Sequence, residues 1–352
     1  MTARSSFISI SETARRFAAL LCGFAAAAVA AELVLHALPY STGYGATQVD
    51  SEHPIGHGTP YLAYTYSRDW SFHLANSGTL NNEGFRASRD YRPDDGGLGV
   101  VGNSFVQSDA VLPSHTMTER VGALLGRSAF SVGGDGFSIA DYSVAARWAI
   151  ERFGVHTVLV LLTTEDLSHS CVPRSGQYYL SVHSGQMALE QVPLPPPSSL
   201  KRLLNRSSLF RYLFDNLHVP YNWSRGWRRN DPSPQPVSAG PPARGCATES
   251  FETAATEFLL NSFRELQRRD AARIVFILAP DYHQQHAVFG VYRDVDAFAD
   301  RAQQEGFELI RLKEAFEAAE RAGTKVDLVP IDRHWSAAGN EVAARAVAAG
   351  LR

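Results

Sequence analysis

The sequence predicts an α/β fold, and three observations support that prediction. Short apolar runs alternate with amphipathic segments along most of the chain. One run, T-V-L-V-L-L at 157–162, is apolar and rich in β-branched residues, as in a strand buried on both faces. Another, at 98–101, ends at a glycine and is followed by a serine and a helical pattern. We therefore expect a three-layer α/β/α sandwich with a mostly parallel, flavodoxin-like sheet of about five strands in right-handed crossovers.

The expected strands and helices follow one another in order. Strands are expected at 98–101, 129–132, 157–162, 273–279 and 307–312. Helices are expected at 116–125, 140–153, 249–269 and from Ser336, which suits an N-cap, to the end of the chain.

The stretch 168–248 is far longer than an ordinary loop and is treated as an insertion. Apolar residues in it fall on one face of a helix, namely Leu200, Leu203, Leu204, Phe210, Leu213, Phe214 and Leu217. We expect a helix docked on the core, or alternatively a cap over the site or a basic amphipathic helix on a membrane.

Composition limits the class of protein. Of 352 residues, 45% are hydrophobic and 20% charged, which excludes a largely disordered chain. The net charge of −3 gives no reason to expect a nucleic-acid partner. The three cysteines fit no zinc pattern, and Cys171 and Cys246 are either a disulfide in an exported protein or two free thiols.

The N-terminus predicts export. Arg15 and Arg16 precede an apolar run that Glu32 interrupts. Residues 17–38 are about long enough to span a bilayer, so we expect a single-pass anchor in the cell inner membrane with the remaining chain in the periplasm. Cleavage near Ala30, releasing a secreted or periplasmic protein, is the first alternative. A buried alanine-rich helix is the second.

We accordingly expect three parts of the chain. Residues 1–39 form the signal anchor or signal peptide, and residues 40–96 form an entry segment rich in short strands and loops, packed on the main domain. Residues 97–352 form the main domain, with the insertion at about 168–248.

Ser104 is the candidate nucleophile. It follows a buried strand and a glycine at the start of an expected helix, where backbone N–H groups stabilise negative charge. The alternative is a plain helix-capping serine. Val106 stands at the last glycine of a G-x-S-x-G elbow, so an α/β-hydrolase is disfavoured.

Asp332 and His334 are the candidate partners of this serine. In an extended segment, residues two apart point the same way, so the imidazole would face Ser104 while the carboxylate holds its other nitrogen. The alternative is a structural histidine at a helix entry. Trp335 either shields the pair from water or packs in the core.

Four sequence blocks, V-G-N-S-F, V-G-G-D-G-F-S, L-T-T-E-D-L and I-D-R-H-W-S, together resemble those of the SGNH/GDSL hydrolase superfamily. The chain is most similar to the membrane-anchored or exported bacterial branch, which includes esterases and O-acyltransferases acting on cell-envelope polysaccharides. The resemblance covers roughly residues 81–351, and N-E-G-F-R upstream also fits it.

The resemblance implies a role for each block. It assigns the catalytic triad to Ser104, His334 and Asp332. It assigns the oxyanion hole to the backbone N–H groups of Ser104 and Gly136, with Gly133 or Gly134 as alternatives to Gly136. Further candidate substrate contacts are Asn103, Thr164, Trp335 and His283.

Two positions depart from the family pattern. Asn103 occupies the position where the family has aspartate. Glu165 occupies the position of an asparagine whose amide donates a hydrogen bond to the oxyanion in that family. An ionised carboxylate would instead repel the oxyanion. Activity would then require a protonated Glu165, a hydroxyl from Thr163 or Thr164, or a hole built from backbone alone.

We therefore expect a serine ester hydrolase or O-acyltransferase acting on an acylated cell-envelope or extracellular glycan, or a similar ester. No metal or organic cofactor is implied. His283 and His286 follow a strand, but only Asp281 accompanies them as a further possible metal ligand. The competing hypothesis is a catalytically degenerate protein that binds an envelope glycan or a biosynthetic partner without turnover.

Overall fold

The computed structural model describes residues 6–93, 97–164, 166–219, 249–280 and 294–352, which fall into two compact units. Over the described residues, the anchor unit combines Met1–Thr42, Thr65–Ala75 and Pro197–Arg229. The sheet unit combines Gly43–Tyr64, Asn76–Pro196 and Asn230–Arg352. The entry segment 40–96 and the insertion 168–248 are thus each divided between the two units.

The sheet unit is built on five parallel strands. They are β3 (Leu98–Gly102), β4 (Ala129–Gly133), β5 (Thr157–Leu162), β8 (Arg273–Leu278) and β9 (Glu308–Arg311). Their order in the sheet is β4-β3-β5-β8-β9, which is the flavodoxin-like order. The predicted fold class is therefore confirmed, and all five strands lie within two residues of their predicted bounds.

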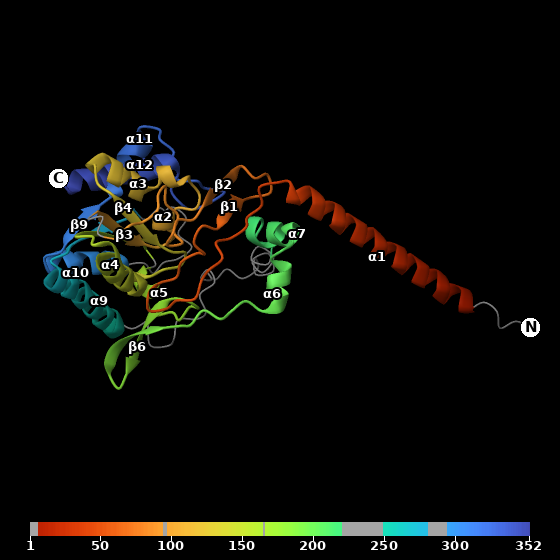
Figure 1. The fold of residues 1–352 in the computed structure, drawn as a ribbon, viewed down its shortest axis with the longest axis horizontal. Coiled ribbons are helices and arrows are strands. Elements are labelled where there is room, and N and C mark those ends of the chain that lie inside the picture. The colour runs from red at the N-terminus through yellow and green to blue at the C-terminus, as the bar shows by residue number, and fades with distance from the viewer. Residues whose placement is uncertain (1–5, 94–96, 165, 220–248, 281–293) are drawn as a thin grey trace, which may run out of the picture. The chain divides into compact units, whose positions relative to one another are not determined.

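Helices cover both faces of this sheet. One core contains residues of α4 (Ile139–Phe153), α9 (Glu249–Asp270) and α10 (Asp294–Gln304). The other contains residues of α3 (Met117–Leu125), α11 (Lys313–Arg321) and α12 (Ala337–Gly350). Figure 1 shows these two groups on opposite sides of the strands. The direction of winding changes between β3 and β5, and α/β folds of this kind bind ligands beyond the carboxyl ends of such strands.

The insertion contains an unforeseen hairpin of β6 (Tyr178–His183) and β7 (Gln186–Gln191). Its two-residue loop is Ser184–Gly185, and both residues have positive φ, 53° and 81°. A serine–glycine pair at a two-residue turn is a recognised hairpin signal. The strands were not predicted because their residues are mostly half-buried and do not alternate cleanly.

The anchor unit begins with α1 (Ser6–His36). Its part Glu12–His36 is long and apolar enough to cross a membrane and almost entirely exposed, so it is not a buried helix. These properties are compatible with a signal anchor or a signal peptide. The short strands β1 (Ala63–Arg68) and β2 (Leu74–Thr79) pair with each other.

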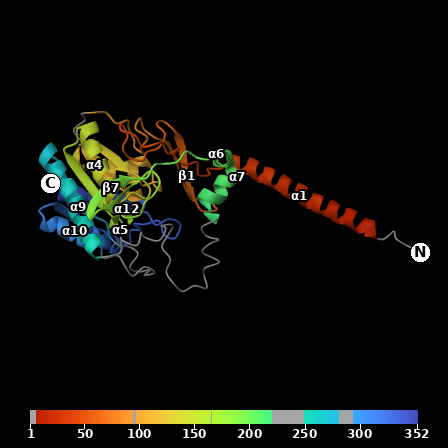
Figure 2. The ribbon, with the colours of Figure 1, turned by 90° about the horizontal axis from the view of Figure 1, so that it is seen from below.

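The amphipathic helix expected at 200–217 is broken. The structure has α6 (Ser199–Leu204), α7 (Ser208–Arg211) and a π-helical turn at Tyr212–Asn216. The break occurs because the Ser207 hydroxyl accepts the Phe210 N–H at 3.1 Å and starts a new helix. Figure 2 shows α6 and α7 beside the end of α1.

Candidate active site

Ser104 lies at the carboxyl edge of the sheet, directly after β3. The side chain of Asn103 accepts the Phe105 N–H at 3.0 Å and caps α2 (Ser104–Gln107). Ser104 is therefore the first residue of this short helix and not its cap, which removes the simple capping interpretation. It is 9% exposed.

The serine meets a histidine from the far end of the chain. His334 Nε2 lies 2.8 Å from Ser104 Oγ, and His334 Nδ1 lies 2.5 Å from Asp332 Oδ1. The same Asp332 oxygen accepts the backbone N–H of His334 at 2.8 Å. The segment is a bend rather than the expected extended strand, and the aspartate orients both the ring and its backbone.

Trp335 supports the histidine from the core. It is 2% exposed, and its ring centroid lies 5.2 Å from that of Phe105 and 5.1 Å from that of Phe316. Phe105 in turn lies 4.9 Å from the His334 ring. Trp335 is thus enclosed by the rings of Phe105 and Phe316 next to His334.

Asp166 forms a buried network beneath the serine. It is fully buried and accepts the Thr163 N–H at 2.6 Å, the Thr163 hydroxyl at 2.9 Å and the Asn103 amide at 3.0 Å. Burial raises the pKa of Asp166 to about 7, although these hydrogen bonds lower it.

This network explains the departure at Asn103. Its amide nitrogen donates to Asp166 and Thr163, while its oxygen accepts the Phe105 N–H, so the Asn103 side chain holds the turn that presents Ser104. The Thr163 hydroxyl is engaged in the same network, and it is therefore not available to an oxyanion.

Replacing Asn103 by aspartate would place a second carboxylate about 3 Å from Asp166. We expect Asn103→Asp to lower the free energy of unfolding by roughly 3 kcal/mol at about pH 8, and by less near pH 5, where one carboxyl is protonated. Urea unfolding at both pH values measures this. The double variant Asn103→Asp, Asp166→Asn restores an amide–carboxylate pair and should regain most of the stability. A loss of equal size at both pH values would contradict the explanation.

The raised pKa of Asp166 makes stability depend on pH. Between about pH 4 and pH 7 the folded chain retains this proton while the unfolded chain has lost it. The free energy of unfolding should therefore fall as pH rises through that window and level off above it. Asp141, whose pKa burial raises to about 6, acts in the same direction. Urea unfolding of Asp166→Asn should show a shallower slope than the parent chain, and an unchanged slope would contradict this assignment.

The glycine block follows β4. Gly136 has φ of +72°, its carbonyl accepts from Arg174 Nη1 at 3.1 Å, and a Cβ there would meet that atom at 3.1 Å. The Gly134 N–H donates to the Gly102 carbonyl at 3.3 Å, and Gly133 lies within β4, so Gly136 remains the preferred oxyanion candidate. Thr164 is half-buried after β5.

Several predicted positions lie outside the described residues. They are Glu165, Asp281, His283, His286 and Cys246. Cys171 is buried.

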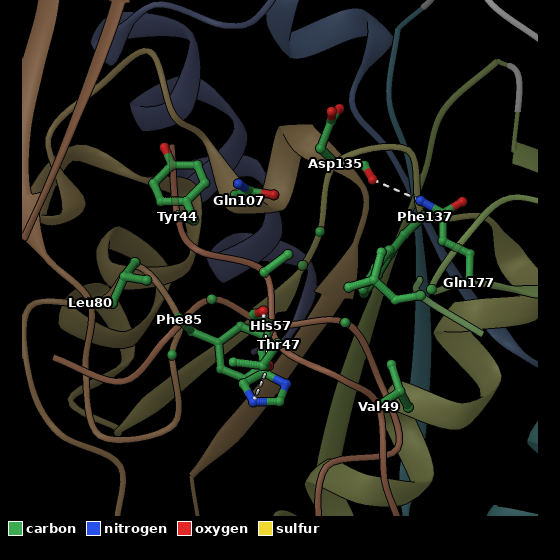
Figure 3. Close-up of a pocket in the computed structure, with 18 of the residues that line it drawn as sticks. Tyr44, Thr47, Val49, His57, Leu80, Phe85, Gln107, Asp135, Phe137 and Gln177 are labelled. Atoms are coloured by element: carbon green, nitrogen blue, oxygen red, sulfur yellow. Dashed lines mark hydrogen bonds between the residues drawn. The ribbon is translucent and has the colours of Figure 1, made fainter. Parts of the chain in front are cut away.

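A cavity of about 210 Å³ lies beside the glycine block (Figure 3). In this view Tyr44, Gln107 and Asp135 lie along one side of it, and Leu80, Phe85 and Val49 along the other. Thr47 and His57 lie next to Phe85, and Phe137 lies near Asp135, so polar and apolar groups both line the cavity, as they do in small-molecule sites.

Asp109 connects this cavity to the histidine. Gln107 Nε2 donates to Asp109 Oδ2 at 3.2 Å. Burial raises the pKa of Asp109, the charges of Arg86 and His334 lower it, and that of Asp135 raises it. Because Gln107 ends the helix that Ser104 begins, and Gln107 lines the cavity together with Gly133 and Gly134 at the end of β4, the cavity and the serine lie at the same edge of the sheet.

No protein-family model and no curated protein sequence matches this chain. Solved structures do match. A lipolytic protein of the G-D-S-L family from Veillonella parvula is 10% identical, with a TM-score of 0.37 over 71% of this chain and 94% of that one. An acetylxylan esterase from Geobacillus stearothermophilus is 13% identical, with a TM-score of 0.37 over 74% and 95%. An acetyl xylan esterase from Butyrivibrio proteoclasticus is 10% identical, with a TM-score of 0.35 over 80% and 67%. These structures, a lipolytic G-D-S-L protein and two acetylxylan esterases, are what the chain is similar to.

Proposed function

We propose that this chain is a serine esterase or O-acyltransferase acting on an acylated cell-envelope or extracellular glycan, or a similar ester. The observation that carries the proposal is the continuous hydrogen-bond chain from Ser104 Oγ through His334 to Asp332. A nucleophile, a base within reach of it and a group that orients the base are the minimum that acyl transfer by serine requires.

In the proposed mechanism, His334 Nε2 takes the Ser104 proton as Oγ attacks the ester carbonyl. Asp332 holds the Nδ1–H and stabilises the imidazolium that forms. When the tetrahedral intermediate collapses, His334 gives its proton to the departing alkoxide and an acyl-enzyme remains. Water attacking this acyl group completes hydrolysis, whereas a sugar hydroxyl completes transfer, and His334 again accepts the proton of the attacking group.

The negatively charged oxygen of each tetrahedral intermediate needs hydrogen-bond donors. We assign the backbone N–H groups of Ser104 and Gly136 to it. Gly136 suits this role because its positive φ lies in the left-handed region. A residue with a side chain would adopt that conformation at a conformational cost of about 1 kcal/mol. At the position where the family that this chain resembles has a third donor, an asparagine, this sequence has Glu165.

Labelling with a fluorophosphonate probe tests the proposal directly. The parent chain should be labelled and should hydrolyse small acetyl esters, and Ser104→Ala should do neither. Assays on acetylated glycans with and without a sugar acceptor then separate esterase from transferase. Absence of both labelling and hydrolysis in the parent chain would favour the alternative function, which is binding of a glycan or a partner without turnover. Asn103 and Glu165, which depart from the family motif, are the reason for considering that alternative.

The apolar helix α1 supports a location at a membrane. We propose a single-pass protein of the inner membrane with the sheet unit in the periplasm. Cleavage near Ala30, giving a secreted or periplasmic protein, is the alternative, and the apparent mass of the exported chain distinguishes the two.

We propose that the cavity of Figure 3 receives the glycan part of the substrate. Val49→Trp would fill it and should raise KM for an acetylated oligosaccharide about tenfold, equivalent to about 1.4 kcal/mol, with little effect on p-nitrophenyl acetate. Val182→Trp, on the exposed strand β6, is the matched control. Equal KM values for Val49→Trp and the control would contradict this role.

A further inference from the structure

The anchor unit exposes apolar side chains beside basic ones. Leu200 and Leu203, three residues apart on α6, are 65% and 63% exposed, and Trp70 is 75% exposed. Lys201 and Arg202 are exposed on the same short helix. We call these five residues the interfacial patch. Large apolar groups left in water next to cations are unusual on a soluble surface and typical of segments that contact lipid.

The Glu32 carboxylate fastens this region to α1. It accepts the Ser207 hydroxyl at 2.7 Å, the Ser208 N–H at 2.7 Å and the Leu209 N–H at 2.9 Å. The Ser208 hydroxyl, on a fully buried residue, adds a bond at 2.8 Å. One acidic residue of α1 thus satisfies the free N–H groups at the start of α7.

A second set of bonds ties the remaining segments together. Asn216 is 2% exposed, its oxygen accepts the Ser41 N–H at 2.9 Å, and its amide donates to Ser67 Oγ at 2.7 Å. The Tyr212 hydroxyl donates to the Trp70 carbonyl at 3.0 Å. Trp70, α7 and the end of α1 therefore form one body, and both views show α6 and α7 beside that end (Figures 1 and 2).

The length of α1 places this body at a bilayer surface. The 25 residues Glu12–His36 extend about 37 Å, whereas a hydrocarbon core is about 30 Å thick. The surplus of about 7 Å corresponds to the polar stretch Glu12–Arg16, so with Arg15 and Arg16 at one surface of the bilayer the other surface lies near His36. The patch is attached within about one helical turn of His36, through Glu32 and α7.

We propose that the interfacial patch lies in the headgroup region of the same bilayer that α1 spans. The leucines of α6 and Trp70 enter the boundary between headgroups and acyl chains, where tryptophan is enriched. Lys201 and Arg202 contact anionic phospholipid. This inference rests on the proposed membrane anchorage, but not on the catalytic assignment.

Depth-dependent quenching tests it on the full chain. A chain with its native cysteines replaced by serine receives one cysteine for an NBD probe, through Leu200→Cys or, on the exposed end of α11, Lys313→Cys; restoring Cys22 gives a third site within α1. Each protein is reconstituted into vesicles of phosphatidylcholine, with and without phosphatidylglycerol, containing acyl-chain brominated lipid. Quenching at position 200 should reach at least about half of that at position 22, and position 313 should show none.

The outcomes separate the two claims. Quenching at position 22 but not at position 200 would overturn the inference and leave the anchor standing. No quenching at position 22 would remove the anchor and the inference together. Phosphatidylglycerol should increase quenching at position 200 about twofold, and Lys201→Gln with Arg202→Gln should abolish that increase. Equal quenching in both lipids would overturn the role given to the two basic residues.

Discussion

Ser104→Ala is expected to lower kcat for hydrolysis of a small acetyl ester by about 10⁴-fold or more, and Asp332→Asn by about 10⁴-fold. The first change removes the nucleophile. The second preserves size but replaces the acceptor of the His334 Nδ1–H, 2.5 Å away, by an amide that favours the wrong tautomer. Steady-state rates at neutral pH measure both effects, and circular dichroism shows whether each variant is folded.

The control for these variants is Ser184→Ala, in the exposed turn of the β6–β7 hairpin, which should leave kcat unchanged. The double variant Ser104→Ala, Asp332→Asn should be no slower than Ser104→Ala alone, because triad members act as a unit. A Ser104→Ala chain that retains the parent rate would show that hydrolysis takes place elsewhere. Loss of rate in Ser104→Ala together with a normal rate in Asp332→Asn would show that another group orients His334.

The sheet was predictable because its strands are buried on both faces. Each residue of β5 is apolar except Thr157, and polar residues, His156 and Thr163, flank the run. Such runs identify parallel strands locally, without knowledge of their neighbours. The same applies to Ser336, whose hydroxyl accepts the Gly339 N–H at 3.1 Å and starts α12 as expected.

The polar network could not be predicted because it depends on strand order. Asn103 reaches Asp166 only because β3 and β5 are neighbours, although β4 lies between them in the sequence. The contact between Glu32 and Ser208 likewise joins residues far apart in the chain. Each of these residues alone has an ordinary explanation, as a cap, a turn or a surface charge, so sequence gave no reason to pair them.

The bend at Asp332 shows a third limit. The sequence predicted that two residues flanking Arg333 would point the same way in an extended strand. The backbone instead turns, and Asp332 Oδ1 binds both the N–H and the ring of His334. An aspartate that accepts a backbone N–H two residues later is a familiar turn, and this pattern was the better local signal.

Glu165→Asn is expected to raise kcat/KM for acetyl ester hydrolysis about a hundredfold. In the family that this chain resembles, the residue at this position donates an amide to the oxyanion, and one such donor is worth on the order of 10²–10³ in rate. An ionised glutamate cannot donate, whereas asparagine can. Glu165→Ala, which removes the charge without adding a donor, is the matched control and should give a smaller gain.

The pH dependence of the rate distinguishes two cases. Either Glu165 is ionised and weakens the oxyanion hole, or it is protonated and donates a hydrogen bond to the oxyanion. If Glu165 is ionised, Glu165→Asn gains rate throughout the neutral range. If it instead works as a neutral acid, the parent chain loses rate as pH rises through the pKa of that carboxyl, and both Glu165→Asn and Glu165→Ala abolish that loss. A variant chain that gains nothing at any pH, with Ser104 still labelled by fluorophosphonate, would show that the backbone N–H groups of Ser104 and Gly136 suffice.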